Sequence, residues 1–283
     1  MPISIAEAIL QGANKLRKAG VPEARREAGS LLAFLLDTDR TFILSHADDP
    51  ISEEQETLFE EFLDARAQGE PAQYITGRQD FYGLEFEVTP AVLIPRPETE
   101  LLIEAAIKLV GAEETVSFCD VGTGSGCIAI TLLTQLPLAH AIAVDVSASA
   151  LEIAKRNAVR HRVTDRIEFL MSDCFASVPP QTFDLIVSNP PYVAEDAVAT
   201  LQREVRDFEP RVALTAGADG LDVIRRLIND AKDYLRPDGH LLFEIGFDQH
   251  EAVGGLIDSE VWRLINIHQD LQGIPRTVAL MRR

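Results

Sequence analysis

The stretch VSNPPYVAED, residues 187–196, places a serine, an asparagine, two prolines and a tyrosine directly after an apolar run. Pro190 and Pro191 have no backbone N–H and hold φ near −65°. Such residues cannot continue a central strand or a helix interior. Two adjacent prolines alone favour a rigid turn at the end of a strand. A chemical role for this stretch therefore depends on which other groups lie beside it.

A glycine loop, CDVGTGSGC at residues 119–127, is the second chemical feature. Gly122, Gly124 and Gly126 allow a ligand to lie against the backbone, and the helix that follows offers free N–H groups. Cys127 stands where the classical dinucleotide pattern GxGxxG has its last glycine, and the lysine of a P-loop is missing. The loop predicts a nucleotide-like ligand and leaves its identity open.

Two aspartates narrow the ligand. Asp145 ends the apolar strand AIAVD about 20 residues after the loop, where an acid can accept hydrogen bonds from both ribose hydroxyls. Asp145 could instead cap the next helix, but Ser147 is available for that role. Asp173 ends a third strand and is placed to accept from an exocyclic amine of a base. Glycines and two acids at successive strand ends predict an adenosine-containing ligand at the topological switch point.

The elements that must position these residues alternate between apolar strands and amphipathic helices. Repeated βα units predict a mainly parallel sheet covered on both faces, an α/β doubly wound fold, with an antiparallel pair at the end of the chain. The expected strands lie near 116–121, 141–146, 167–171, 183–188, 240–245, 261–267 and 277–281, and the expected helices near 126–135, 147–160, 220–235 and 249–257.

The N-terminal part of the chain has a different pattern. Residues 1–75 read as four or five helices, two of them opened by the capping boxes Ser4–Glu7 and Ser52–Gln55. Residues 76–100 contain FYGLEFEVT, which predicts a hairpin, and a proline-stiffened connector. We therefore expect a helical substrate-recognition domain, a hairpin linker, and a main domain at 101–283.

Composition limits the function classes. The net charge of −19 disfavours nucleic-acid binding, which draws much of its affinity from basic contacts to phosphate, although a local basic patch remains compatible with it. The apolar runs are too short for a membrane helix and the N-terminus does not resemble a signal peptide, so we expect no membrane association. Three cysteines without a CxxC pair and histidines without metal spacing predict a cytoplasmic protein without a metal site.

Together these motifs resemble those of S-adenosylmethionine-dependent methyltransferases that act on planar nitrogen. Five segments narrow the resemblance to the peptide chain release factor N5-glutamine methyltransferase family: FYGLEFEVTPAVLIPRPETE, DVGTGSG, SNPPY, EPRVALTAGADGL and EIGFDQ. The resemblance implies a Rossmann-like class I methyltransferase domain with a seven-stranded sheet. It also implies S-adenosyl-L-methionine as cofactor, and class I peptide chain release factors, methylated on the glutamine of their Gly-Gly-Gln loop, as partners.

The implied reaction explains the unusual residues. An amide nitrogen is a poor nucleophile because its lone pair is delocalised, so the site must orient the NH₂ group and disperse the developing positive charge. The side-chain oxygen of Asn189 and the carbonyl of Pro190 can each accept one N–H, and the ring of Tyr192 can pack on the amide plane. The resemblance thus makes Asn189, Pro190 and Tyr192 catalytic, with Pro191 as a further substrate contact.

The same resemblance distributes the cofactor among the other motifs. It gives Asp145 the ribose, Asp173 and Cys174 the adenine, and Asn189 a contact to both cofactor and substrate. Arg96, Glu98 and Thr99 lie in the connector that would border the pocket, and Arg96 is a candidate substrate contact; a structural salt bridge and a helix cap are the alternative. The loop residues Gly122, Thr123, Gly124, Ser125 and Gly126 would hold the methionyl part.

Two alternatives stay open at the level of the sequence. A nucleobase N-methyltransferase acting on DNA adenine or ribosomal RNA guanine would use the same Asn-Pro-Pro-aromatic clamp. A non-catalytic adaptor could bind S-adenosylmethionine without turnover, although such a protein would not need an intact Asn-Pro-Pro-Tyr segment.

Overall fold

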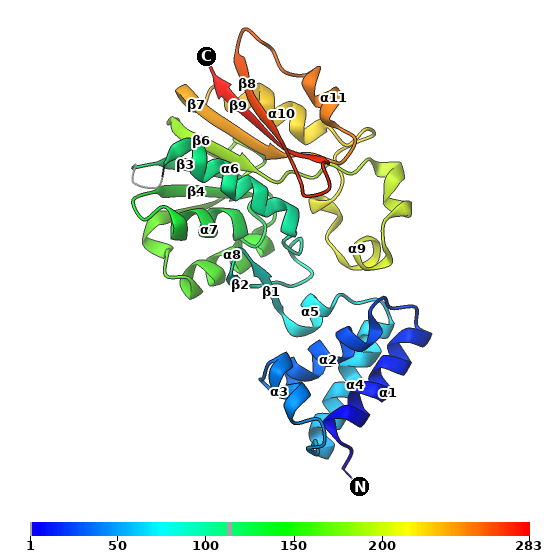
Figure 1. Ribbon diagram of the computed structural model, residues 1–283. Helices are drawn as coiled ribbons and strands as arrows, with labels where there is room; N and C mark the ends of the chain where they lie inside the picture. Colours follow the sequence, from blue (N-terminus) through cyan, green and yellow to red (C-terminus); the bar gives the residue numbers. More distant parts are fainter. Residues whose placement is uncertain (1, 112–114) are drawn as a thin grey trace. The chain divides into compact units, whose positions relative to one another are not determined.

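The chain folds into two compact units in the computed structural model, which describes residues 2–111 and 115–283 (Figure 1). The helical unit joins the residues through Gly77 to the short segment 202–208, and the sheet unit joins 78–201 to 209–283. The chain therefore passes between the units after Gly77, after Leu201 and again after Phe208.

The helical unit is built from amphipathic helices whose starts are fixed by side-chain caps. Both predicted capping boxes are present: Ser4 with Glu7, and Ser52 with Gln55, exchange side-chain and backbone hydrogen bonds. The apolar faces of the helices meet in one buried cluster that includes Leu16, Leu31, Leu32, Phe59 and Leu63. The helices are α1 (Ile5–Lys18), α2 (Ala24–Leu35), α3 (Arg40–Ser45), α4 (Glu53–Ala67) and α5 (Ala72–Thr76).

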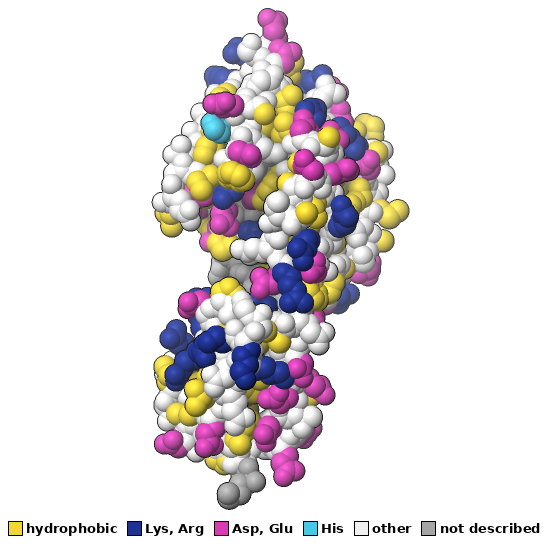
Figure 2. Space-filling model, turned by 90° about the vertical axis from the view of Figure 1, so that its right-hand side faces the viewer, with side chains coloured by type: hydrophobic (Ala, Val, Ile, Leu, Met, Phe, Trp, Pro, Cys, Tyr) yellow, Lys and Arg dark blue, Asp and Glu magenta, His cyan; other side chains and the backbone are white. Residues whose placement is uncertain are grey.

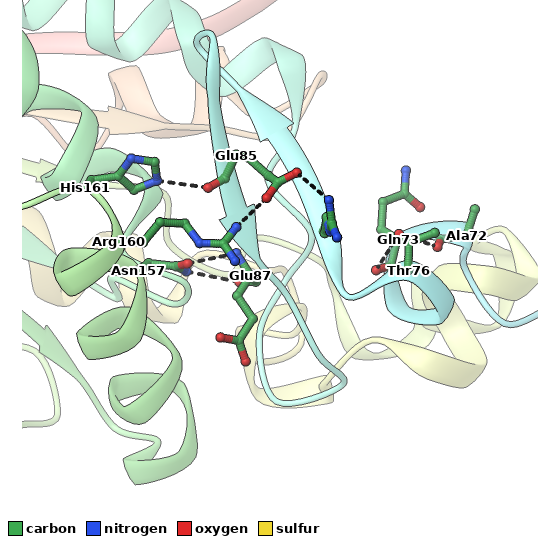
Figure 3. Close-up of polar contacts among 9 residues, drawn as sticks. Ala72, Gln73, Thr76, Glu85, Glu87, Asn157, Arg160 and His161 are labelled. Atoms are coloured by element: carbon green, nitrogen blue, oxygen red, sulfur yellow. Dashed lines mark hydrogen bonds and ion pairs between the residues drawn. The ribbon is translucent and has the colours of Figure 1, made fainter. Parts of the chain in front are cut away.

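The predicted hairpin consists of β1 (Arg78–Phe81) and β2 (Leu84–Glu87), paired antiparallel. It is fixed to helix α8 (Ala148–Arg160) by polar contacts (Figure 3). The buried Asn157 amide accepts from the backbone N–H of Glu87 at 2.8 Å and donates to its carbonyl at 3.0 Å. The same amide donates to the carbonyl of Ser125 at 2.9 Å, so it links the hairpin to the glycine loop.

The sheet unit is centred on a seven-stranded sheet of order β5-β4-β3-β6-β7-β9-β8. β3, β4, β5, β6 and β7 run parallel, whereas β9 runs antiparallel to both of its neighbours. The mainly parallel sheet and the antiparallel pair at the end of the chain are thus confirmed. The strands are β3 (Ser117–Val121), β4 (His140–Asp145), β5 (Ile167–Met171), β6 (Phe183–Ser188), β7 (Leu235–Glu244), β8 (Trp262–Gln269) and β9 (Pro275–Arg282).

Helices cover both faces of this sheet, as expected for a doubly wound fold (Figure 1). One buried cluster joins the sheet to α6 (Glu100–Val110) and α7 (Cys127–Gln135). A second cluster joins the opposite face to α10 (Asp222–Ala231) and α11 (His250–Gly254). Alternate side chains of each central strand enter different clusters. Both faces of these strands are therefore buried, which explains why their sequences are almost continuously apolar.

Several elements differ from the sequence-based expectation. β7 begins at Leu235 rather than near 240, because the polar segment Arg236–Gly239 hides the start of the strand. Helix α9 (Arg203–Phe208) and the 3₁₀ helices η1 (Pro97–Thr99), η2 (Thr164–Arg166), η3 (Glu195–Thr200) and η4 (Arg211–Ala213) have no counterpart in the prediction. Segment 202–208, expected within the main domain, groups with the helical unit.

Candidate active site

A cavity of about 340 Å³ lies at the carboxyl ends of β3, β4, β5 and β6, entirely within the sheet unit. Parallel strands bring their carboxyl ends to one edge, which explains why motifs far apart in the sequence meet here. The connector before α6 and the segment around η4 complete the wall. The predicted site residues that line the cavity are Gly122, Thr123, Gly124, Ser125, Asp145, Asp173, Cys174, Asn189, Pro190 and Pro191.

The glycine loop turns the chain from β3 into α7. Gly126 precedes α7 with φ +81°, and an added Cβ there would lie 2.8 Å from the Ile130 side chain. Below the loop, the buried Asp120 accepts from the Thr123 hydroxyl at 2.7 Å and from the Ala129 N–H at 3.3 Å. Burial raises the pKa of Asp120 to about 7. The loop therefore rests on a carboxyl group that the sequence interpretation did not single out.

Asp145, the last residue of β4, binds the glycine loop from the neighbouring strand. Its carboxylate accepts from the Gly124 N–H at 2.8 Å and from the Ser147 N–H at 2.9 Å. Ser147, not Asp145, caps α8 by accepting from the Ala150 N–H at 3.2 Å. Two backbone donors leave a carboxylate with further acceptor positions, so Asp145 retains the capacity to bind ligand hydroxyls. Burial raises its pKa.

Asp173 and Cys174 form the next part of the wall. The Asp173 carboxylate forms an ion pair with Arg226 of α10 at 2.9 Å. The Cys174 thiol is buried, and this burial raises its pKa, so it behaves as a small apolar wall residue rather than as a thiolate. Whether either residue meets a base stays a prediction.

The Asn-Pro-Pro-Tyr segment directly follows β6, whose last residue is held by a hydrogen bond. Ser188 Oγ donates to the Val121 carbonyl at 2.7 Å, which ties the ends of β6 and β3 together. Asn189 Nδ2 donates to Thr99 Oγ1 at 3.0 Å. Tyr192 is not among the residues found to line the cavity in the described chain; its hydroxyl donates to Glu244 Oε1 at 3.2 Å. Burial, reinforced by the Glu244 charge, raises the pKa of Tyr192.

Two residues of the connector before α6, Arg96 and Thr99, differ in their relation to the cavity. The Arg96 guanidinium pairs with the buried carboxylate of Glu209, and Arg96 itself is not among the cavity-lining residues of the described chain. Thr99 lines the cavity, and its hydroxyl donates to Glu244 Oε2 at 2.6 Å. Gly126, like Arg96, lies outside the lining set.

The sequence interpretation missed two residues that hold the Asn-Pro-Pro-Tyr segment. Glu244 ends β7 and is 1% exposed. Gln249 accepts from the Gly246 N–H at 2.9 Å and donates to the Tyr192 carbonyl at 3.0 Å. Both residues belong to the segment EIGFDQ, which contributed to the family resemblance without being given a role in the site. Glu244 also ends a buried strand, as Asp145 does, whereas only the fold brings Gln249 near Tyr192.

The charges around the loop discriminate between possible ligands. Asp120, Asp145 and Asp173 place carboxyl groups at or beside the cavity, and the Arg226 guanidinium pairs with the last of these. An ionised Asp145 would attract a nucleoside that carries positive charge. The site therefore fits S-adenosylmethionine, with its sulfonium and ammonium groups.

Cysteines, possible metal ligands and long apolar helices can also be located in the part of the chain that the structure describes. The three cysteines are free and buried, and no group of three or more potential metal ligands comes together among the described residues. No described helix is long and apolar enough to span a membrane.

Two family models match separate parts of the chain. The PrmC N-terminal domain matches residues 7–77, and the methyltransferase small domain matches residues 97–207. The release factor glutamine methyltransferase of Koribacter versatilis is 42% identical over 277 residues, which cover 98% of this chain and 98% of that protein. The release factor glutamine methyltransferase of Cereibacter sphaeroides is 44% identical over 274 residues, 97% of each chain.

A solved structure supports the fold. The 16S rRNA methyltransferase RsmC of T. thermophilus, solved in complex with AdoMet and guanosine, aligns with a TM-score of 0.53 at 18% identity. The alignment covers 73% of this chain and 50% of that one. At this identity the likeness establishes the class I methyltransferase fold.

Proposed function

Because the chain belongs to the family of release factor glutamine methyltransferases, we propose that its sheet unit methylates the side-chain amide nitrogen (N5) of a glutamine in a class I peptide chain release factor. The observation that carries this proposal is the meeting of the glycine loop, Asp145 and Asn189 in one cavity. S-Adenosylmethionine supplies an electrophilic methyl group when it is bound there.

The cofactor would be held by groups at three strand ends. The loop from Gly122 to Gly126 provides close backbone approach, and Asp145 provides acceptors for the ribose hydroxyls. Asp173 and Cys174 border the space proposed for the adenine. The acids would balance the positive charges of the cofactor.

The substrate amide would be oriented by Asn189 and Pro190. Asn189 uses its Nδ2 group toward Thr99, which leaves its Oδ1 atom to accept a substrate N–H. The Pro190 carbonyl offers a second acceptor, held by a backbone whose φ is fixed by the proline ring. Two acceptors on the NH₂ group direct its lone pair and stabilise the positive charge that develops on nitrogen.

Release factor recognition would involve surfaces beyond the cavity. On the face drawn in Figure 2, Lys and Arg side chains gather on the helical unit although the chain carries a net charge of −19. Exposed basic residues of this unit include Arg17, Lys18, Arg25 and Arg26. These basic residues offer contacts to acidic groups on a protein partner. Nucleic acid as a substrate is not favoured, because the near full-length relatives carry the release factor name.

The test is transfer of a labelled methyl group to three acceptors: a class I release factor, the same factor with its loop glutamine changed to alanine, and a mixture of DNA and ribosomal RNA. We expect label on the intact factor alone. Asn189→Ala should lower kcat by about 10²–10³-fold with little change in cofactor affinity. Asn229→Ala, at an exposed position of α10, is the control and should match the parent. Label on nucleic acid alone would overturn the proposal.

A further inference from the structure

Four side chains form a chain of hydrogen bonds that starts at the cavity wall: Asn189, Thr99, Glu244 and Tyr192. Asn189 Nδ2 lies 3.0 Å from Thr99 Oγ1, which lies 2.6 Å from Glu244 Oε2. The other carboxylate oxygen, Glu244 Oε1, lies 3.2 Å from the Tyr192 hydroxyl. Thr99 and Glu244 are each 1% exposed, so water does not compete for these contacts.

The number of protons fixes the direction of every bond in this chain. A threonine hydroxyl has one proton, and the 2.6 Å contact to a carboxylate places that proton on the Glu244 side. The Thr99 oxygen is then left only as an acceptor toward Asn189. Asn189 must therefore present Nδ2 to Thr99 and direct Oδ1 elsewhere.

This direction matters because Asn189 lines the cavity and the proposed substrate offers N–H groups. With Oδ1 available, Asn189 accepts from the substrate amide. With the amide turned over, two NH₂ groups would face each other and neither would have an acceptor. The ionised state of Glu244 thus decides whether Asn189 can recognise an amide.

The same carboxylate also holds the other end of the clamp. Tyr192 is the fourth residue of the Asn-Pro-Pro-Tyr segment, and its hydroxyl donates to Glu244. We propose that Glu244 and Thr99 are positioning residues for methyl transfer, which set the polarity of the Asn189 amide and the place of the Tyr192 ring. This inference rests on the proposed function, because it needs an amide substrate.

The groups around Glu244 determine how it responds to pH. Burial raises its pKa, while the hydrogen bonds from Thr99 and Tyr192 and the charge of Arg276 oppose that effect and Glu98 adds to it. The Cys127 thiol also lies within electrostatic range. Protonation of Glu244 would allow its carboxyl group to donate to Thr99. The hydrogen bonds from Glu244 through Thr99 to Asn189 would then run in the opposite direction. We therefore expect kcat to fall as the pH drops through the Glu244 pKa.

Thr99→Val removes the hydroxyl while keeping the shape of the side chain. We expect kcat for release factor methylation to fall by about a hundredfold, whereas KM and the cofactor Kd change by less than about threefold. Thr99→Ser should recover most of the lost kcat because it restores the hydroxyl. The acidic limb of the kcat profile should be reduced in Thr99→Val, since the link from Glu244 to Asn189 is cut and only the contact from Glu244 to Tyr192 remains.

Thr277→Val is the matched control. Thr277 is fully buried, pairs directly with Glu244 across β7 and β9, and its hydroxyl has no hydrogen-bond partner among the described residues. We expect this variant to keep the parent kcat and pH profile. Equal kcat and equal pH profiles for Thr99→Val and Thr277→Val would refute the inference.

Tyr192→Phe tests the hydrogen bond from Tyr192 to Glu244, and it remains available if Thr99→Val fails to fold. It keeps the aromatic ring and removes only the bond to Glu244, so we expect a severalfold loss of kcat with unchanged cofactor Kd. An unchanged kcat in this variant would contradict the proposal that Glu244 positions Tyr192. If the parent protein placed no label on the glutamine of the factor, the proposed function itself would fail, which is a different result.

Discussion

Asp145 combines a structural and a ligand-binding role in a single carboxylate. It accepts from the backbone of Gly124 and of Ser147, and it lines the cavity. Burial raises its pKa, because the charged form loses hydration that two backbone donors only partly replace. The ionised form is the one that can accept from two ribose hydroxyls at once. Cofactor affinity should therefore depend on the protonation of this residue.

Replacing Asp145 by asparagine should weaken S-adenosylmethionine binding by about 1–3 kcal/mol at pH 8, because charge-assisted hydrogen bonds are lost. In the parent protein the affinity should fall as the pH drops through the Asp145 pKa. Since that pKa is raised, the fall should begin above the range of an ordinary aspartate, whose pKa is near 3.9. Calorimetric titrations between pH 5 and about 8 measure both effects. An unchanged Kd in Asp145→Asn would remove the residue from the cofactor site.

The sequence predicted some site residues and missed others for one physical reason. Asp145 and Asn189 directly follow apolar strands, so the parallel-sheet rule alone brings them to one edge. Thr99 was expected beside the pocket from its place in the connector, but its hydrogen bonds to Glu244 and Asn189 were not, because they require two other segments to approach. Arg96 was predicted beside the pocket, and its pairing with Glu209 depends on a contact across 113 positions.

At the scale of elements, the Asn-Pro-Pro-Tyr segment is supported by the loop before α10. Gly220 adopts φ +73°, and a Cβ added there would lie 2.2 Å from the Tyr192 carbonyl oxygen. The same carbonyl accepts from Gln249 at 3.0 Å. The Val193 N–H donates to the Leu214 carbonyl at 2.8 Å, which extends the support beyond the clamp. The backbone of the clamp is therefore held by two loops as well as by its own prolines.

Gly220→Ala should displace Tyr192 and lower kcat by at least about tenfold, while the cofactor Kd stays within about twofold. Gly83→Ala is the matched control, because Gly83 has φ +74° and no atom within 4 Å of an added Cβ. Both variants should lose about 1–2 kcal/mol of unfolding free energy from the left-handed backbone, and Gly220→Ala should lose more because its added Cβ meets the Tyr192 carbonyl. Only Gly220→Ala should lose turnover. Steady-state kinetics and denaturant unfolding separate the two effects, and equal kcat values would contradict the prediction.

The elements themselves differ in how far sequence patterns reveal them. The strands β3, β4 and β6 were predicted nearly to their ends because their apolar runs are bounded by polar or glycine residues. Helix α9, with the sequence REVRDF, has no apolar period and no buried residue. Its packing partner lies in the first part of the chain, so no local pattern identifies it.

At the scale of the whole molecule, segment 202–208 pairs by charge with the rest of the helical unit, while the chain on either side of it belongs to the sheet unit. The Arg66 side chain, 6% exposed, pairs with Glu27 of α2 and with Glu204 of α9. The segment lies in the sequence between Asn189 and the cavity residues around Pro210. The chain thus leaves the cavity wall after the Asn-Pro-Pro-Tyr segment, enters the helical unit at 202–208 and returns to the wall at Pro210.

Deleting residues 1–77 should preserve the cofactor site, because neither buried cluster of the sheet unit includes a residue from this range. We expect the cofactor Kd to change by less than about threefold. Methylation of an intact release factor should lose at least about tenfold in kcat/KM. The deletion removes the exposed basic residues of the helical unit together with Arg66, which pairs with Glu204 of α9. A short peptide that carries the same glutamine loop serves as the second substrate.

The two substrates and one point variant separate the possible causes. Loss on the intact factor alone would mean that the helical unit recognises the partner, as we expect. Loss on the peptide as well would mean that α9 also holds the cavity wall, and Glu204→Gln in the full chain should then reproduce part of that loss. Glu195→Gln, at an exposed position of η3 outside segment 202–208, controls for the removal of one negative charge. Undiminished activity of the truncated chain on the intact factor would exclude a recognition role for the helical unit, because binding energy supplied by that unit must appear in kcat/KM.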